Sequence, residues 1–365
     1  MDSVTQILLG AAVGGMVMGK QMGRKALLWG GAFGLFPDLD VLLPFGDAVK
    51  DFTYHRGASH SLFVLTVLTP FFVYLIRKIH PMAPVHRLRL FAAVHLILVT
   101  HALLDCLTVY GTQIFWPLPT PPVMWSTIFI IDPAYSIPMA VGVLTALLLA
   151  GRGTTAGWRI NTVCFALSTL YLVWTVGVKL HVTKTARESL LQQSIGYERL
   201  LTVPSPFNTL LWRILVMDRQ GYYEGFYSLL DSEKELQFHR YESRPELIEN
   251  AMDLWQIRRL QWFTQGFYAV SKEGQNIVIT DLRMGMEPFY IFRFAVAAVE
   301  EGRIEAIVSR RIPIQPRLEQ IRWVWQRIWQ QDMEPVFTSE TPQDASVTSG
   351  SSLTPKAEAR FSSST

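Results

Sequence analysis

The sequence predicts an N-terminal all-α multi-spanning membrane domain, followed by a small soluble α+β domain and a disordered tail. Half of the 365 residues are hydrophobic, and the mean hydropathy of +0.22 is high for a soluble protein. The apolar residues form long runs up to about residue 181 and are scattered among charges after it. From about residue 338 the chain is rich in Ser, Thr and Pro, which is typical of disorder. We therefore expect domains at 1–185 and 186–337 and a tail at 338–365.

The membrane domain is predicted from apolar runs of the length that a span requires, about 20 residues. The candidate spans are 3–19, 61–79, 88–109, 128–150 and 159–180. The chain opens on Met1-Asp2 without a basic segment, so the first run is expected to be a retained span and not a signal peptide.

A further apolar stretch, 26–44, contains Pro37, Asp38 and Asp40, and a short or broken helix is expected there. In the first span, Gly10 and Gly14 are four residues apart, which suits close helix packing in lipid. Ordinary use of small residues would give the same pattern.

Basic residues in the loops indicate an orientation. They form clusters at Lys20, Arg24 and Lys25, at Arg77, Lys78, Arg87 and Arg89, and at Arg152 and Arg159. If the broken stretch is counted as a crossing, all these clusters lie on one side, which the positive-inside rule makes cytoplasmic. The other side holds the loops 38–60 and 110–127 and everything after residue 181. Lys179, Lys184 and Arg187 argue against this orientation, because they follow the last span on that side.

The second half of the chain has the composition of a soluble α+β domain. Runs of aromatic and branched residues predict strands at 212–217, 221–230, 259–271, 276–284, 288–299 and 303–311. Hairpin turns are predicted at 272–275 and 300–302, and helical character at 245–258 and 316–331.

Charge and cysteine content exclude several classes of function. The net charge of +3 gives little support to nucleic-acid binding, so no nucleic-acid partner is expected. Cys106 and Cys164 each lie inside an apolar run and are interpreted as small core residues. A disulfide framework or a cysteine-based zinc site is therefore disfavoured.

Ionisable residues in the apolar half point to a functional site, because a central Asp costs about 2.5–3.5 kcal/mol in hydrocarbon. The first cluster is Asp38 and Asp40 after a proline, where both carboxylates could reach one cation, although such pairs often only cap turns. The second is His55, Arg56 and His60, just before a span. Imidazole is the commonest metal ligand, and the Arg56 guanidinium suits an anionic substrate.

The third cluster is His101 and Asp105, which lie at i and i+4 and therefore on one helix face. They require each other, a cation or another polar partner. His95 is six residues earlier and off that face. The three clusters fall on one side of the predicted membrane, as a di-metal hydrolase site built from several elements requires.

These motifs, in the order MDSVTQILLGAAVG, FPDLD, HRGASHS and HALLDCLTVYGTQIFWP, resemble the YdjM-like family of membrane-bound, metal-dependent hydrolases of bacteria, also described as LexA-regulated. The resemblance covers about residues 1–185. It implies an inner-membrane, multi-pass protein. It also implies metal ligands at Asp38, Asp40, His55, His60, His101 and Asp105.

One position departs from the family pattern. The family often has His after the Thr of its first motif, whereas this chain has Thr5-Gln6, and Gln is a poorer ligand for zinc-like metals. The motif order is also similar to that of the all-helical, zinc-dependent phospholipase C site, which favours phosphoester chemistry.

The expected function is therefore hydrolysis of a lipid or lipid-linked phosphoester at the membrane face, with membrane lipid as the partner. The cofactor would be a divalent ion: zinc, manganese or magnesium. Asp40 or Asp105 would act as base, and Arg56 would steady negative charge. The alternative is a non-enzymatic membrane protein with a structural polar network and a partner-binding C-terminal domain. The sequence leaves the oligomeric state open.

Overall fold

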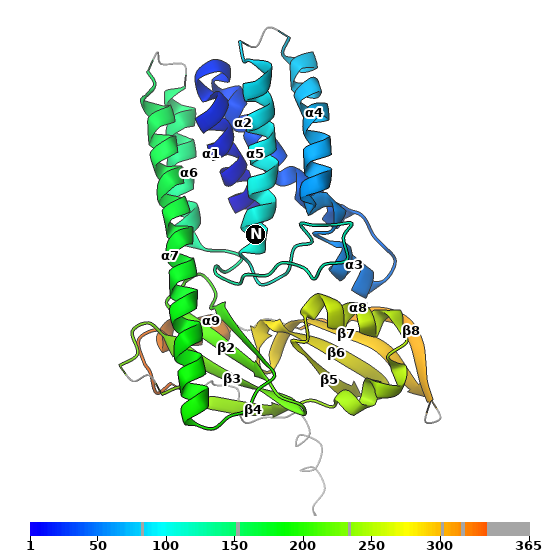
Figure 1. Ribbon diagram of the computed structural model, residues 1–365. Coiled ribbons are helices and arrows are strands. Elements are labelled where there is room, and N and C mark those ends of the chain that lie inside the picture. Colours follow the sequence, from blue (N-terminus) through cyan, green and yellow to red (C-terminus); the bar gives the residue numbers. More distant parts are fainter. Residues whose placement is uncertain (82–83, 151–153, 233–234, 301–302, 315–317, 334–365) are drawn as a thin grey trace, which may run out of the picture. The chain divides into compact units, whose positions relative to one another are not determined.

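The computed structural model describes residues 1–81, 84–150, 154–232, 235–300, 303–314 and 318–333 (Figure 1). The predicted tail at 338–365 and Arg152 of the third basic cluster lie outside the described residues. Residues Met1–Met333 form one unit. Within it, the helices of the first half gather at one end and two sheets at the other (Figure 1).

The first half is helical, as predicted. Its elements are α1 Ser3–Met22, α2 Arg24–Leu35, η1 Phe36–Leu42, α3 Ala48–Tyr54, η2 Ala58–His60, α4 Leu62–Ile79, α5 Arg87–Cys106, α6 Pro133–Leu149 and α7 Ala156–Gln192. Four of them, α1, α4, α5 and α7, are long and apolar enough to cross a membrane, and α6 is a shorter apolar helix. The multi-spanning fold class is confirmed.

The broken helix expected at 26–44 is α2 followed by the 3-10 turn η1. With 12 residues, α2 is too short to cross the hydrocarbon core alone, since a helix rises about 1.5 Å per residue and the core is about 30 Å thick. Pro37 has no backbone N–H and cannot donate the hydrogen bond that a continuing α-helix requires, and the chain enters η1 at Phe36. This places Asp38 and Asp40 on a turn at the foot of the helices.

Helices α1 and α2 pack with their backbones in contact. A Cβ atom at Gly10 or Gly30 would collide with the carbonyl oxygen of the other residue, and one at Gly34 would collide with the carbonyl oxygen of Gln6. Gly14 likewise faces the carbonyl oxygen of Ala26. The sequence analysis linked Gly10 and Gly14 to close packing, and the structure shows that α2 is their partner.

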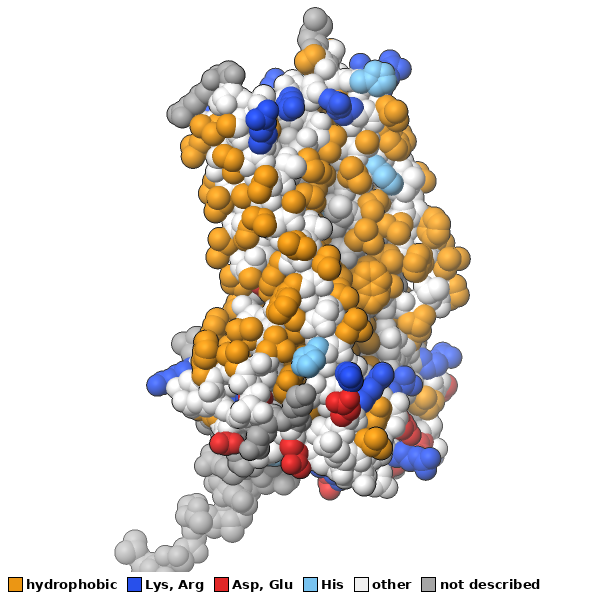
Figure 2. All heavy atoms as spheres, turned by 60° about the vertical axis from the view of Figure 1, so that its left-hand side comes forward, with side chains coloured by type: hydrophobic (Ala, Val, Ile, Leu, Met, Phe, Trp, Pro, Cys, Tyr) orange, Lys and Arg blue, Asp and Glu red, His pale blue; other side chains and the backbone are white. Residues whose placement is uncertain are grey.

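Charged side chains mark the two ends of the helical region. Basic residues lie where α1 turns into α2, where α4 ends and α5 begins, and at the start of α7. Figure 2 shows Lys and Arg side chains at that end, a broad hydrophobic zone over the helices, and further charges on the sheets. The His and Asp clusters lie at the opposite end from these basic turns.

The second half contains two four-stranded antiparallel sheets, each in chain order. The first holds β1 Arg199–Pro204, β2 Leu211–Met217, β3 Gly221–Ser228 and β4 Phe238–Glu242; the second holds β5 Tyr268–Glu273, β6 Asn276–Met286, β7 Phe289–Glu300 and β8 Arg303–Arg311. Three helical segments accompany them: η3 Pro245–Ala251, α8 Trp255–Thr264 and α9 Leu318–Arg327.

The strand predicted at 259–271 is wrong in its first half. Residues 259–264 belong to α8, because Ile257, Leu260 and Phe263 are buried at helical spacing. The aromatic residues of this run gave a strand-like composition. The hairpin at 272–275 is confirmed, while the one at 300–302 lies partly outside the described residues.

Two hydrophobic cores are shared between the helices and the sheets. The last turns of α7, with Val182, Ala186 and Leu190, share a core with Trp212 and Ile214 of β2. In addition, Val49 and Phe52 of α3 and Val109 and Tyr110 of the loop after α5 join a core that contains residues of both sheets. The sheets therefore support the loops that carry the predicted site.

Candidate metal centre

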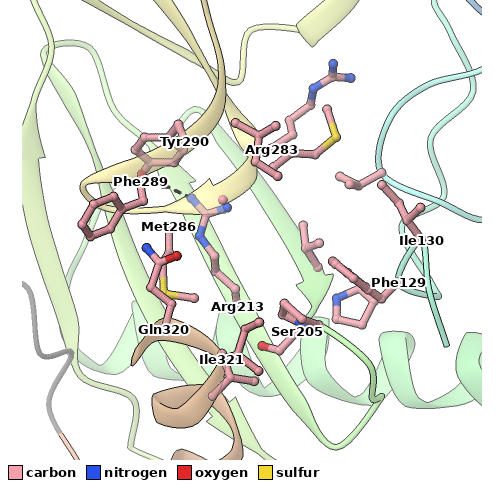
Figure 3. Close-up of a pocket in the computed structure, with 18 of the residues that line it drawn as sticks. Phe129, Ile130, Ser205, Arg213, Arg283, Met286, Phe289, Tyr290, Gln320 and Ile321 are labelled. Carbon is pink, nitrogen blue, oxygen red and sulfur yellow. Dashed lines mark hydrogen bonds between the residues drawn. The ribbon is translucent and has the colours of Figure 1, made fainter. Parts of the chain in front are cut away.

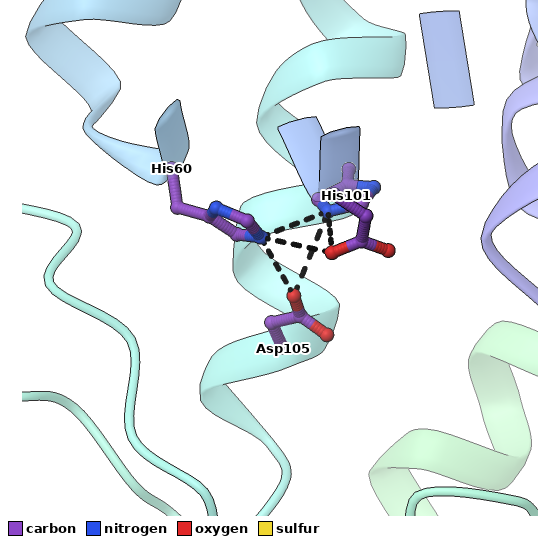
Figure 4. Close-up of side chains that lie close together, drawn as sticks. His60, His101 and Asp105 are labelled. Atoms are coloured by element: carbon purple, nitrogen blue, oxygen red, sulfur yellow. Dashed lines mark hydrogen bonds and ion pairs between the residues drawn. The ribbon is translucent and has the colours of Figure 1, made fainter. Parts of the chain in front are cut away.

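Four ionisable side chains from three elements meet at the foot of the helices. Asp38 comes from η1, His60 from η2, and His101 and Asp105 from α5, and one potential ligand atom of each lies within 4.8 Å of the others. Figure 4 shows His60, His101 and Asp105 pointing toward one another. All three of these side chains are fully buried, whereas Asp38 is half-buried.

The distances fit ligation of one ion. His60 Nε2 lies 3.1 Å from His101 Nε2 and 3.1 Å from Asp105 Oδ2. Asp38 Oδ1 lies 3.4 Å from His60 Nε2 and 3.5 Å from His101 Nε2. Atoms bound about 2.0–2.2 Å from one ion in tetrahedral geometry lie about 3.3–3.6 Å from each other. The four groups need only small shifts to share an ion.

Local structure explains this convergence. On α5, the i, i+4 spacing places His101 and Asp105 on one face. The chain reverses at Arg56, whose φ is 59°, and His60 N then donates to the Gly57 carbonyl. This turn places His60 directly before α4, opposite α5.

Hydrogen bonds fix which ring nitrogen of each histidine faces the cluster. His101 Nδ1 lies 2.7 Å from the Gly34 carbonyl oxygen, which can only accept, so Nδ1 carries a proton. Ser59 donates its hydroxyl proton to Asp40, and its oxygen can then accept from His60 Nδ1 at 2.9 Å. In both neutral rings Nε2 is then an unprotonated acceptor aimed into the cluster.

Two acceptor nitrogens and two carboxylates cannot share this space without a positive charge between them. A metal ion supplies that charge, and so does a proton. Burial lowers the pKa of His60, but the hydrogen bonds to Asp105 and Asp38 outweigh it and raise this pKa above its ordinary value. Burial raises the pKa of Asp38, and its hydrogen bonds to His101 and His60 hold it well below the ordinary value.

The two oxygens of Asp105 face different partners. Oδ1 contacts Arg56 Nη2 at 3.3 Å, accepts from Gln6 Nε2 at 3.1 Å and forms an ion pair with the Met1 α-amino group. Oδ2 faces His60 and His101. Positive and donor groups therefore hold one oxygen, and the other is directed at the candidate ion.

Two buried polar atoms next to Asp105 have no partner among the described residues. They are Gln6 Oε1 and Arg56 Nε. Gln6 holds Asp105 through its amide nitrogen, and Arg56 holds it through Nη2, so both orphan atoms lie close to the centre. Buried polar atoms of this kind are typical of sites that bind a further ligand. They support the fit of the centre to an ion and its associated ligands.

Asp40 and His55 lie beside the centre but outside this group of four. Asp40 Oδ1 lies 2.7 Å from His55 Nδ1, and Asp40 Oδ2 accepts from Arg56 N and Ser59. Burial raises the pKa of Asp40, but the hydrogen bond to His55 outweighs it and the pKa is lowered. The metal-ligand roles of Asp40 and His55 stay predictions.

The other polar residues near the centre have separate places. Arg56 is buried, donates to Thr108 Oγ1 at 3.1 Å and lies over the Tyr110 ring. His95 lies away from the cluster, with Nδ1 3.4 Å from Thr69 Oγ1. Thr108 and Tyr110 were not predicted from the sequence. The i, i+3 spacing from Asp105 indicates Thr108, whereas no sequence signal indicates Tyr110.

A comparison with protein families identifies the family of the helical half. Residues 1–182 match the family model described as YdjM inner membrane protein. The chain belongs to this family. All four residues of the candidate metal centre lie inside the YdjM region, and its apolar helices fit a multi-pass protein of the inner membrane. No curated protein and no solved structure matches the chain. The sheets, from Arg199 onward, lie beyond the YdjM match.

Proposed function

We propose that this protein is a membrane-bound hydrolase that uses a divalent metal ion held by Asp38, His60, His101 and Asp105. The observation that carries the proposal is the convergence of two histidine nitrogens and two carboxylates within 4.8 Å in a buried site. Mixed nitrogen and oxygen ligands suit zinc or manganese better than magnesium, which prefers oxygen.

A divalent ion bound there supplies Lewis acidity, which activates water and stabilises negative charge on a substrate oxygen. The chain supplies the remaining functions. Arg56 offers an unpartnered, buried Nε–H to an anionic substrate group. His55, whose Nδ1 is oriented by Asp40 Oδ1 at 2.7 Å, is the side chain that we propose to carry a proton.

A phosphoester on a lipid or lipid-linked molecule is the proposed substrate class. The centre lies where α4 begins and α5 ends, so it sits at the end of two candidate spans. A guanidinium beside the ion suits a phosphate group, whose charge it can share. A substrate anchored in the bilayer would reach such a site without leaving the membrane surface.

A structural polar network is the second candidate function, and one observation favours it. Arg56 and the Met1 α-amino group balance the charge of Asp105, and a proton on His60 would balance that of Asp38, without a metal ion. In that case the cluster would hold η1, α1 and α5 together. Substitution of a ligand residue would then lower the stability of the fold, and there would be no catalytic activity to lose.

Metal analysis of the purified protein separates these candidates. We expect about one zinc or manganese ion per chain after mild detergent purification, and hydrolysis of bis-p-nitrophenyl phosphate. His60→Ala and His101→Ala should lose both ion and activity while remaining folded. His95→Ala is the matched control, because His95 lies on the same helix outside the cluster. Absence of metal from the folded wild-type protein would overturn the proposal.

A further inference from the structure

A second possible binding site lies in the sheet region. A pocket of about 630 Å³ is lined by strands of both sheets, by α9 and by the loop before α6 (Figure 3). Its volume is within the range of about 300–1,000 Å³ that is usual for small-molecule sites. The four residues of the metal centre are not among those that line it. The pocket therefore requires its own explanation.

The walls of the pocket are mainly apolar. Phe129 and Ile130 come from the loop before α6, Met286 and Phe289 from the β6–β7 hairpin, and Ile321 and Val324 from α9. Two arginines in the lining are already paired: Arg213 with Glu224, and Arg283 with Asp281. The pocket thus offers an apolar interior without a free buried charge at these two positions.

Two polar atoms in the lining have no partner among the described residues. Ser205 Oγ is buried, with the residue only 3% exposed, and Gln320 Nε2 belongs to the facing helix α9. Figure 3 shows both side chains at the pocket. A buried donor without a partner is costly, so a ligand with oxygen atoms at this position would be stabilised. Apolar walls with a few polar groups are typical of a site for an amphiphile.

The position of the pocket indicates the source of that amphiphile. Phe129 and Ile130 lead directly into Asp132, which caps α6. The Ile130 carbonyl oxygen also accepts from Asp2 N, at the start of the candidate span α1. The loop that forms one wall of the pocket therefore leads to the first residues of two apolar helices. Membrane lipid is the nearest source of long apolar chains.

We propose that this pocket binds one acyl chain of a membrane lipid, with carboxyl or ester oxygens at Ser205 and Gln320. The C-terminal tail is a weaker candidate, because residues 334–365 are rich in Ser and Thr and poor in the apolar residues that the walls would favour. The inference does not depend on the metal centre, since the two sites share no lining residue.

A photoreactive fatty acid tests the proposal. The full-length protein in phospholipid nanodiscs is irradiated with palmitic acid that carries a diazirine in its chain, and labelled peptides are mapped by mass spectrometry. We expect labels in the segments 203–206, 284–291 and 320–324, as well as in the membrane helices. Ile321→Trp should lower the pocket label at least about fivefold, because the indole would occupy part of the apolar volume that the acyl chain needs.

Arg322→Trp is the matched control, because Arg322 is exposed on the same helix and does not line the pocket. Unlabelled palmitic acid added to the wild-type protein should remove the pocket label and leave the label on the spans. This competition uses only the wild-type protein, so it tests the proposal even if Ile321→Trp does not fold. Three results would overturn the proposal: labels on the spans alone, equal labelling of the two tryptophan variants, or pocket labelling only after residues 334–365 are deleted.

Discussion

At the scale of single residues, the carboxylates of the centre differ in what their oxygens contact. Asp105 directs Oδ2 at two histidine nitrogens. Both oxygens of Asp40 are already occupied, one by His55 and the other by Ser59 and the Arg56 amide. Asp40 is therefore proposed as a positioning residue that acts through His55 and Ser59, and Asp105 as a ligand.

Asp40→Asn should separate these roles. The substitution keeps the size of the side chain and removes the charge that orients His55 and Ser59. We expect phosphodiesterase turnover to fall about 10²–10³-fold, with a changed pH–rate profile, while metal content is retained. Asp105→Asn should instead lose the ion. If Asp40→Asn also lost it, Asp40 would be a ligand, as the sequence predicted.

The sequence predicted much of this centre, and its limits have a physical cause. The spacing of His101 and Asp105 identifies a shared helix face directly. His60 enters the centre and His55 stays beside it because the chain reverses at Arg56. Arg56 has a positive φ, which a non-glycine residue rarely adopts. The Gly34 carbonyl that orients His101 is a backbone group, which no residue-type pattern marks.

At the scale of elements, the contact between α1 and α2 positions the centre. Gly34 accepts the hydrogen bond from His101, and Gln6, whose carbonyl lies against Gly34, holds Asp105. Gln6 and Gly34 both belong to the close contact between the backbones of α1 and α2. The packing of these helices and the geometry of the ligands are therefore coupled.

Gly30→Val should disturb both properties. The added side chain would collide with the Gly10 carbonyl oxygen and push α2 away from α1. We expect a loss of about 1–3 kcal/mol of stability, as for other overpacked cores, and weaker metal binding. The melting temperature in detergent and a metal titration would measure these effects. Gly177→Ala on α7 is the control, because a Cβ there meets nothing within 4 Å; equal stability of both variants would contradict the packing.

Glu287, in the hairpin between β6 and β7, is expected to make the folding stability depend on pH. Burial and the nearby Glu224 charge raise the pKa of Glu287, although Tyr222 donates a hydrogen bond to it. An unfolded Glu ionises near pH 4.3, at about its reference pKa. The folded state therefore holds this proton to higher pH, and stability falls as pH rises through the window between the two values.

Glu287→Gln should reduce that fall, because an amide has no proton to lose in this range and its oxygen can still accept from Tyr222. Melting temperatures of both proteins at about pH 4 and about pH 7 provide the measurement. We expect a smaller decrease in the variant than in the wild-type protein. An equal decrease would show that Glu287 does not contribute to the pH dependence.

At the scale of the whole molecule, the basic turns and the metal centre lie at opposite ends of the helices. From the positive-inside rule we predict that the centre and the sheets lie outside the cytoplasm. Hydropathy and loop charge were sufficient to predict that the basic turns and the His and Asp clusters lie at opposite ends of the helices, whereas the orientation stays a prediction. They did not predict the second contact between helices and sheets, which depends on aromatic packing of Phe52 with Phe263 and Phe294.

Cysteine labelling tests the orientation. In a background without Cys106 and Cys164, a membrane-impermeant maleimide should label Lys272→Cys in intact cells and leave Lys25→Cys unlabelled. Both native side chains are exposed, one in the β5–β6 hairpin and one at the start of α2. Permeabilised cells should label both positions. The reverse pattern in intact cells would place the centre on the cytoplasmic side.

The length of helix α7 determines where the sheets lie relative to the bilayer. Its 37 residues correspond to about 55 Å at 1.5 Å per residue, well beyond the roughly 30 Å of hydrocarbon. Its final turns are docked on β2 through Val182, Ala186 and Leu190. Because each residue inserted into a helix rotates the C-terminal part of the chain by about 100°, α7 can tolerate length changes only near whole turns. It therefore acts as a spacer that sets both the height and the rotational register of the sheets.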